Sequence, residues 1–577
     1  MSGINASAAE SDAILPSAVE SGTDDAPAPA PAPSSSATTD PETSLEALRN
    51  LAVSPTSSLA HVPVSMSAGA DPWADPTPQL DPRSLSASDK ASNTSSSSQA
   101  GNAEHSAARN TSSVSSSNPW ATGESENAAG PAPSAHKLAS QEEYGLPRLG
   151  HDAARYWNFK KGFTNLNNGS YGACPIPVLE AWRALSDKAE ENPDLFLLRT
   201  RDELLQSALS RLSKMLNCPT STLALIPNAT TASNAVLRDL YFQDGDGILT
   251  LNVGYGAVNK TLSYVYETHT NLKTKLHDVL VPIKLPASDD EILKAVEESI
   301  VAATAKQIKI RLGIFDAISS MPGIKLPWVE LVQLLRKHDI LSFVDGAHAF
   351  AQVPLDLQAA DPDFFVSNIH KWGYAHRGCA VFYVPRRNQH LQRSSLPTSW
   401  SYVENASGQT NTWAEQWAAN ATIDQSSFLS VDAALTFAEK LGGYERLRRY
   451  THDLARKGAL EVARVLGSEL LDPSGERTAA MVNVRVPVAA HCTQGEVDKW
   501  FAAARPWFWN TLQDEFKTAI PLYTYDSKIW ARFSAQAWLE VSDFEWGARA
   551  LRELVRRVNV GEVMFVDGKA VESSPSA

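Results

Sequence analysis

Short apolar segments alternate with stretches of helical pattern between about residues 156 and 384 of this 577-residue chain. Two parallel strands must be joined by a long crossover, which is usually a helix, so this alternation predicts a mostly parallel sheet with helices on both faces. The expected fold class is therefore α/β. The predicted strands cover residues 223–226, 248–251, 276–281, 308–315, 340–344, 364–366 and 379–384.

A second group of elements follows this region. Two long helical patterns at 431–441 and 444–466 precede a strand at 482–486, a helix near 494–503 and a strand around 530–534. We expect a large domain over 151–428 and a smaller α+β domain over 429–567, to which the segment just before the large sheet also contributes.

The N-terminal part of the chain differs sharply in composition. Residues 1–140 contain 31 Ser, 15 Pro, 5 basic and 15 acidic residues, so they carry −10 of the formal net charge of −14. Such a segment cannot bury enough apolar surface to offset the entropy that it would lose on ordering. We expect a disordered tail over 1–150 and a short disordered end over 568–577.

The charge and the cysteines exclude several classes of function. Beyond the tail, 46 basic and 50 acidic residues leave no basic excess, which argues against a nucleic-acid or anionic-membrane surface. The four cysteines are scattered without the paired spacing of a metal site, so we expect no metal and a reducing compartment. No apolar run approaches the ~20 residues of a membrane span, and no signal peptide is recognisable. The expected location is the cytoplasm.

Polar residues at the ends of the predicted strands are the candidates for chemistry, because ligands of open α/β sheets bind outside the carboxyl ends of the strands. Asp345 follows one predicted strand, with His348 three residues later, and His370 and Lys371 follow the next. A carboxylate and a lysine at neighbouring strand ends form either a structural ion pair or a site in which a desolvated lysine acts as a nucleophile.

A third candidate lies at residues 228–233, between a strand and a helix. The N–H groups at a helix start bind phosphate well, although the local pattern by itself favours simple capping of the helix by Asn228 or Thr230. A phosphate-binding site, a carboxylic acid and a lysine at neighbouring strand ends are together the groups that bind pyridoxal phosphate in proteins.

Four motifs make a resemblance to a known family specific. They are Asn-Asn-Gly-Ser-Tyr-Gly at 167–172, Asn-Ala-Thr-Thr at 228–231, Asp-Gly-Ala-His at 345–348 and Asn-Ile-His-Lys-Trp at 368–372. These motifs resemble those of the class V, fold-type I pyridoxal-phosphate enzymes, and most of all the isopenicillin N epimerase-like branch, which includes fungal hercynylcysteine sulfoxide lyases. Segments 387–391, 396–400 and 532–536 are also similar to that branch.

The resemblance implies roles for the central residues. Lys371 corresponds to the lysine that forms the Schiff base with the cofactor and then moves the proton at Cα of the substrate. Asp345 pairs with the pyridine nitrogen, and His348 contacts the phenolic oxygen. Tyr255 either stacks on the pyridine ring, as the family's aromatic residue does, or is a core aromatic.

The resemblance also implies a phosphate site and a dimer. Ala229, Thr230 and His370 would hold the phosphate, together with Asn368, which replaces the Ser of related desulfurases. Thr422 resembles the threonine that reaches the phosphate of a neighbouring subunit, which implies a homodimer with shared active sites.

Two further residues would bind the amino-acid substrate. Arg532 matches the family's arginine for the substrate α-carboxylate, for which its fork of donors is suited; the alternative is a surface charge. Asn168 contacts the same substrate or sets a turn before Gly169.

The leading interpretation is a pyridoxal-phosphate-dependent carbon–sulfur lyase acting on a cysteine conjugate like hercynylcysteine sulfoxide, as in ergothioneine synthesis. A desulfurase is disfavoured, because its nucleophilic cysteine would follow the helix near 494–503, whereas Cys492 precedes it. The alternatives are an amino-acid epimerase, with Tyr171 or His376 as the second proton donor, another class V aminotransferase-like enzyme, and a non-catalytic scaffold.

Overall fold

The computed structural model describes residues 145–269, 276–392, 402, 413–418, 422–488, 496–566 and 569–572. The predicted tail up to residue 144, the 396–400 motif and Cys492 lie outside the described residues.

A seven-stranded sheet is the centre of the large domain. Its strand order is β2-β8-β7-β6-β5-β3-β4, and the five strands from β7 to β4 are parallel. β8 runs antiparallel to both of its neighbours. The predicted mostly parallel sheet is thus confirmed. Its strands are β2 (Leu223–Ile226), β3 (Asp246–Leu251), β4 (His277–Val281), β5 (Lys309–Asp316), β6 (Leu341–Asp345), β7 (Phe364–Asn368) and β8 (Ala380–Tyr383).

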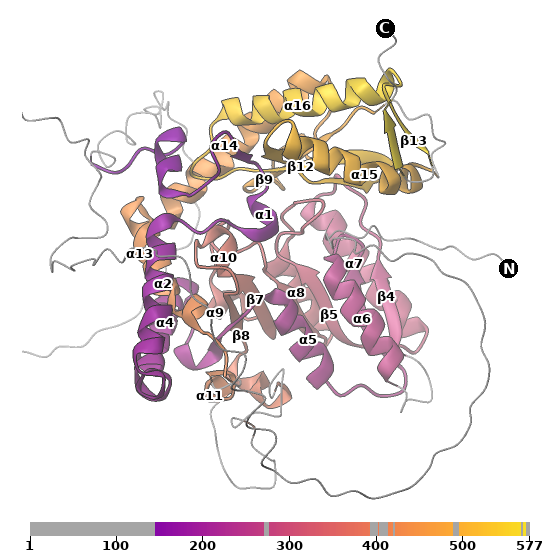
Figure 1. The fold of residues 1–577 in the computed structure, drawn as a ribbon. Helices are drawn as coiled ribbons and strands as arrows, with labels where there is room; N and C mark the ends of the chain where they lie inside the picture. The colour runs from indigo at the N-terminus through magenta and orange to yellow at the C-terminus, as the bar shows by residue number, and fades with distance from the viewer. Residues whose placement is uncertain are drawn as a thin grey trace, which may run out of the picture. The chain divides into compact units, whose positions relative to one another are not determined.

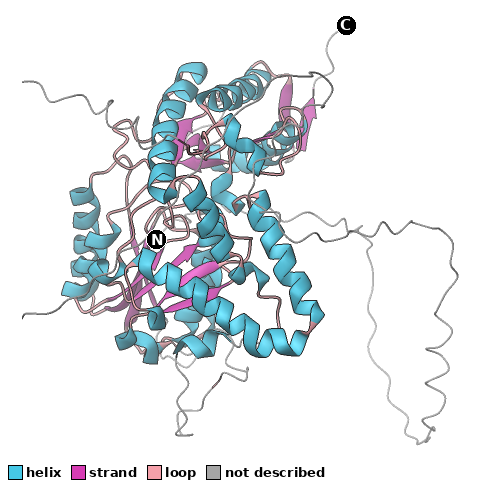
Figure 2. Ribbon diagram, turned by 90° about the vertical axis from the view of Figure 1, so that its left-hand side faces the viewer, coloured by secondary structure: helices cyan, strands magenta, loops and turns pink. Residues whose placement is uncertain are grey.

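Helices cover both faces of this sheet (Figure 2). The strands β2, β3, β7 and β8 are buried along their whole length, as expected for a sheet covered on both sides. Four helices connect successive strands along the chain and lie beside the sheet in Figure 1, namely α5 (Ala229–Asp239), α6 (Gly256–Thr268), α7 (Asp289–Ala305) and α8 (Trp328–Lys337).

A smaller antiparallel sheet follows in the chain and is drawn in gold in Figure 1. Its strand order is β11-β12-β9, and the helices α14 to α16 pack around it. Among the described residues, no helix is both long and apolar enough to cross a membrane. The elements are β9 (Met481–Arg485), β11 (Leu522–Tyr525), β12 (Lys528–Ser534), α14 (Gly443–Leu466), α15 (Val497–Asp514) and α16 (Val541–Asn559).

The segment before the large sheet crosses from one sheet to the other. β1 (Thr164–Asn165) pairs in parallel with β10 (Thr518–Ala519), and the Ser534 N–H donates to the carbonyl of Leu166 at 2.8 Å. The next element is the short helix α1 (Asn168–Tyr171), whose Gly169 N–H donates to Ser534 Oγ at 3.2 Å. This segment therefore brings early residues of the chain to the edge where the two sheets meet.

Candidate active site

Lys371 and His348 meet at the carboxyl ends of β6 and β7. Lys371 lies in the single turn α10 (Ile369–Trp372) directly after β7, and its Nζ lies 2.8 Å from His348 Nε2. The ring of His348 also contacts two carbonyl oxygens, that of Gly169 at 2.8 Å and that of Ile318 at 3.3 Å. Burial, followed by the charges of Lys371 and Arg532, holds the pKa of His348 well below its ordinary value, so this imidazole is neutral.

Asp345 is the last residue of β6 and lies beside the same lysine. Its carboxyl group accepts the Ala347 N–H at 2.9 Å. Burial raises the pKa of Asp345, and the Ala347 hydrogen bond and the charge of Lys371 oppose that rise. The predicted acid and lysine are therefore together in one buried group.

Asp316 belongs to this group, although the sequence reasoning missed it. It is the last residue of β5 and the register partner of Asp345 on β6. Burial and the neighbouring Asp345 raise the pKa of Asp316 well above its ordinary value. The signal was present in the sequence, because Asp316 directly follows a predicted strand just as Asp345 does.

The start of α5 lies close to the end of β7. Asn228 caps the helix by accepting the Thr231 N–H at 2.9 Å, so the capping interpretation is confirmed. Asn368 Oδ1 accepts the Ala229 N–H at 3.0 Å, which joins the helix start to the strand that leads to Lys371. Thr230 is exposed in the first turn. Ala229 and Asn368, two of the residues expected at the phosphate site, are thus in direct contact.

His370 is held in place by the strand that follows. Its Nδ1 lies 2.8 Å from the carbonyl oxygen of Cys379, just before β8. Burial lowers the pKa of His370 to about 4, with a further contribution from the charge of Lys371. His452, on α14, also has its pKa lowered to about 4 by burial, and its Nε2 lies 2.8 Å from the Gln352 carbonyl oxygen.

These two histidines predict acid sensitivity. The pKa of each histidine is near 4 in the folded protein and 6.5 in the unfolded chain. Between these two pH values the unfolded chain therefore binds more protons than the folded protein. The free energy of unfolding is thus at its full value above pH 6.5 and falls as the pH drops toward 4. We expect His452→Gln, which retains a donor for Gln352, to reduce the loss of unfolding free energy between pH 6.5 and 5 by about 1 kcal/mol. Urea unfolding at several pH values measures this; equal slopes in variant and wild type would contradict it.

Arg532 comes from β12 of the smaller sheet and is only 1% exposed. Its Nη1 donates to the Ser320 carbonyl at 2.8 Å, and its Nη2 donates to Asn167 Oδ1 at 2.8 Å and to Ser170 Oγ at 3.1 Å. The alternative of a surface charge is therefore wrong. The guanidinium is oriented by two separate segments of the chain, the loop after β5 and the α1 segment, as a rigid binding site requires.

The α1 segment joins Arg532 to Lys371. Asn168 is fully buried and its Nδ2 donates to the Lys371 carbonyl at 3.3 Å, while its Oδ1 has no hydrogen-bond partner within the described residues. Gly172 has φ 69°, and a Cβ there would lie 1.8 Å from the His370 carbonyl oxygen. Any side chain at position 172 would collide with the backbone of α10, so only glycine allows the end of the α1 segment to pack directly against the turn that contains Lys371.

The other residues singled out in the sequence lie around this group. Tyr255 is half-buried at the start of α6. Thr422 is exposed, and no hydrogen bond among the described residues joins it to the group. Tyr171 is 55% exposed, whereas His376 stacks on Trp182 with 4.0 Å between ring centroids. The expectation that Thr422 serves a neighbouring subunit stays a prediction.

The assembled residues fit pyridoxal phosphate. The group offers a buried amine at Lys371, a buried carboxyl at Asp345, an unpartnered amide oxygen at Asn168 and an adjoining helix start. These are the group types that the cofactor's aldehyde, pyridine nitrogen, polar substituents and phosphate require. Apart from Asn168, which lies in α1, they lie at or directly after the ends of β2, β6 and β7.

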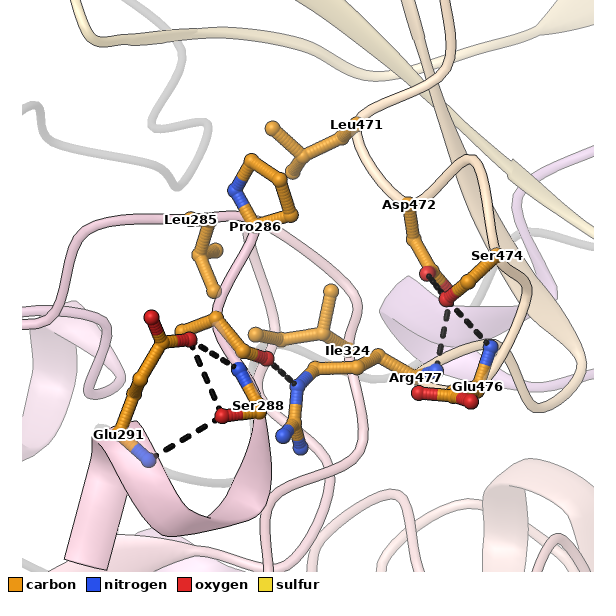
Figure 3. Close-up of a pocket in the computed structure, with 11 residues that line it drawn as sticks. Leu285, Pro286, Ser288, Glu291, Ile324, Leu471, Asp472, Ser474, Glu476 and Arg477 are labelled. Carbon is orange, nitrogen blue, oxygen red and sulfur yellow. Dashed lines mark hydrogen bonds between the residues drawn. The ribbon is translucent and has the colours of Figure 1, made fainter.

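A cavity of about 260 Å³ lies elsewhere, between the segment before α7 and the loop before β9 (Figure 3). Arg477 spans it from the smaller domain by donating to the Ala287 carbonyl at 2.5 Å and to Asp289 at 2.9 Å. None of the residues singled out in the sequence lines this cavity.

Comparison with known proteins gives a consistent result. Residues 199–496 match the model of the family described as Aminotransferase class-V. The L-cysteine desulfhydrase-like protein lolT2 of Epichloe uncinata is 33% identical over 69% of this chain and 91% of that protein. The hercynylcysteine sulfoxide lyase of Schizosaccharomyces pombe is 30% identical over 70% of this chain and 97% of its own length. The solved complex of the cystine C-S lyase C-DES with cysteine persulfide has a TM-score of 0.52 at 19% identity, covering 69% of this chain and 98% of that one, and so shares the fold.

Proposed function

This chain belongs to the class V aminotransferase family of pyridoxal-phosphate enzymes, and we propose that it is a carbon–sulfur lyase that acts on a cysteine conjugate. The observation that carries the proposal is the contact of 2.8 Å between Lys371 Nζ and His348 Nε2, beside the buried Asp345. A desolvated amine next to a neutral imidazole and a carboxyl group suits both cofactor attachment and proton transfer.

The resemblance to the family suggests a role for each residue, and the contacts described above support these roles. Asp345 would keep the pyridine nitrogen protonated, while His348 would contact the phenolic oxygen and Tyr255 would cover the ring. Thr230, His370 and Asn368 would hold the phosphate with the start of α5. Arg532 would bind the substrate α-carboxylate, and Asn168 would contact the same substrate from α1. Pyridoxal phosphate bound there supplies an electron sink for negative charge at the substrate Cα.

Lys371 would carry the proton in the reaction. Its Nζ would remove the Cα proton of the bound substrate, and the cofactor would take up the negative charge left at Cα. The bond between Cβ and sulfur then breaks, and the sulfur group leaves with the electron pair. The remaining three-carbon fragment takes up water and yields pyruvate and ammonia.

The described cysteines support elimination without a persulfide step. Burial raises the pKa of Cys174 to about 12 and that of Cys218 to about 11, and it raises the pKa of Cys379 further still. These three thiols are therefore protonated near neutral pH and are poor nucleophiles.

The finer assignment is a sulfoxide of a histidine-derived cysteine conjugate. The Schizosaccharomyces pombe relative named hercynylcysteine sulfoxide lyase, together with the motifs at 387–391 and 532–536, supports this substrate and hence a place in ergothioneine synthesis. We further propose a cytoplasmic homodimer in which Thr422 completes the partner's phosphate site; its exposed position supports this.

The activity assay follows the fate of the substrate. With hercynylcysteine sulfoxide in deuterated water, we expect one pyruvate and one ammonia for each molecule of sulfenic acid that is released, and an added thiol reductant converts this sulfenic acid to the thiol that is measured. S-methylcysteine sulfoxide and S-methylcysteine serve as matched substrates without the histidine-derived part and without the sulfoxide oxygen. Exchange of the Cα hydrogen for deuterium without pyruvate release would instead identify an epimerase. A protein that binds no pyridoxal phosphate would refute the proposal that this chain is an enzyme of this kind.

A further inference from the structure

Gln352 lies in the turns that follow β6 and joins the candidate active site to the smaller domain. It is fully buried, and its side-chain amide makes two hydrogen bonds. Its Nε2 donates to the carbonyl of His348 at 2.7 Å, and its Oε1 accepts the Ala480 N–H at 3.0 Å. Neither the motifs of the sequence nor the proposed roles include this residue.

The two partners fix the orientation of this amide. A carbonyl can only accept a hydrogen bond and an N–H can only donate one, so a single orientation of the amide satisfies both. The backbone carbonyl of Gln352 is engaged as well, because it lies 2.8 Å from Nε2 of His452 on α14. Gln352 therefore contacts the smaller domain at two points and the candidate active site at one.

The Ala480 side of this bridge leads to the strand of the substrate arginine. Ala480 directly precedes β9, and its carbonyl accepts the N–H of Ala535 at 2.7 Å. Ala535 directly follows β12, which pairs with β9 and carries Arg532. The Gln352 amide is therefore two hydrogen bonds away from the end of that strand.

The His348 side of the bridge leads to Lys371, whose Nζ lies 2.8 Å from the imidazole. Trp372, the next residue, belongs to a cluster of buried apolar side chains from both domains, and the residues on either side of Gln352 pack against it. The cluster consists of Ile318, Trp372, Ala479, Ala480 and Met481, with Ala351 and Val353 packed against them. An amide in such surroundings is costly unless it is hydrogen-bonded, so both of its bonds matter.

The turn before Gln352 is strained. Ala351 has φ 64°, a left-handed conformation that costs free energy in any residue with a Cβ. Residues held in this conformation cluster at functional sites, where the surrounding structure maintains them. The strained turn is therefore a separate indication that the placement of Gln352 serves the site.

We propose that Gln352 is a positioning residue whose amide fixes His348, and with it Lys371, relative to the strand that carries Arg532. A substrate held by its α-carboxylate at Arg532 would then present its Cα proton to Lys371 Nζ. This alignment rests on the proposed function, whereas the two hydrogen bonds belong to the protein without cofactor.

The test variant is Gln352→Leu, because leucine has a similar size and makes neither hydrogen bond. Gln352→Met keeps the unbranched side chain and offers only a weak acceptor, so it replaces the leucine variant if that variant does not fold.

Gln392→Leu is the matched control. Gln392 is also buried, and its side chain donates to Asp239, the last residue of α5. The first residue of α5, Ala229, contacts the site through Asn368. The length of the helix places the Asp239 contact about 15 Å from that end.

We expect Gln352→Leu to speed hydrogen exchange at the Ala480 amide at least about tenfold in the cofactor-free protein. Mass spectrometry of peptides that contain residue 480 measures this. Gln392→Leu should lower thermal stability and leave the exchange at Ala480 unchanged.

In the loaded enzyme, with hercynylcysteine sulfoxide as substrate, we expect kcat of Gln352→Leu to fall about 10- to 100-fold, because small misplacements of reacting groups slow a reaction strongly. The KM and the dissociation constant for pyridoxal phosphate should stay within about threefold of wild type, since Arg532 keeps its contacts with Ser320 and the α1 segment. With substrate deuterated at Cα, the isotope effect on kcat should increase, because proton removal becomes the slower step. Gln392→Leu should match wild type in all of these.

Three results would overturn the inference. If the Gln352 variants matched Gln392→Leu in kcat and isotope effect, Gln352 would have a structural role only. A loss confined to KM or to cofactor affinity would mean that Gln352 acts on binding and not on alignment. Unchanged exchange at Ala480 would refute the bridge itself. That measurement needs no cofactor, so an inactive wild type would refute the proposed function, while the exchange rate would still decide whether the bridge exists.

Discussion

Lys371→Ala is expected to bind pyridoxal phosphate without the visible absorbance of the lysine-bound cofactor and to release pyruvate at least about a thousandfold more slowly than wild type. The reason is that the Nζ contacts His348 at 2.8 Å beside Asp345, so no other described amine lies in position to hold the cofactor or to take the Cα proton. Absorbance spectra and single-turnover pyruvate assays measure the two losses separately.

A lysine on the surface of the same domain provides the control. Lys337, the last residue of α8, is exposed and precedes the amino end of β6, whereas the site lies at the carboxyl end of that strand, so Lys337→Ala should match wild type in spectrum and rate. Pyruvate release by Lys371→Ala at a tenth of the wild-type rate or more would mean that another group moves the proton.

Arg532→Lys is expected to raise the KM for substrate about 10- to 100-fold, which corresponds to the loss of one or two charge-assisted hydrogen bonds. A lysine cannot reproduce the planar fork that here donates to Ser320, Asn167 and Ser170 while presenting the guanidinium to a carboxylate. The visible absorbance of the bound cofactor should persist. Initial rates over a wide range of substrate concentration separate KM from kcat.

Arg477→Lys is the matched control, because Arg477 is also buried and also donates to carbonyl groups, but lines the separate cavity in Figure 3. It should lower thermal stability and leave the KM unchanged. A normal KM in Arg532→Lys would assign the substrate carboxylate to another residue.

The sequence predicted the order of the elements well because most strands of the large sheet are largely buried and rich in apolar residues. The predicted strand at 223–226 coincides with β2, and the others begin or end within two residues of the observed strands. The reversed direction of β8 was not predictable from these runs, since a buried strand has the same apolar pattern in either direction. It follows from the short connection after Lys371, which leaves no room for a crossover helix.

For the candidate site, local patterns were informative only where the chemistry lies at strand ends. Asp345 and Lys371 were found in this way, and the same rule applied to every strand finds Asp316. The positions of Asn168 and Arg532 depended on the family motifs, because their proximity to Lys371 is created by tertiary contacts. The hydrogen bond between Asn368 and Ala229 likewise joins two loops separated by an intervening strand, which no local pattern reveals.

The α1 segment and the strand on which it packs are synthesised at very different times. Gly169 and its partner Ser534 are 365 positions apart, so the segment emerges from the ribosome long before the strand on which it packs. At ~5–20 residues per second, this interval lasts between about 20 and 70 seconds. During that time the apolar residues Trp157 and Leu166, buried in the finished protein, have no small sheet to cover them. The nascent chain therefore passes through a period in which these apolar residues lack their packing partners, and Arg532 is added only after the whole of the large sheet has been made.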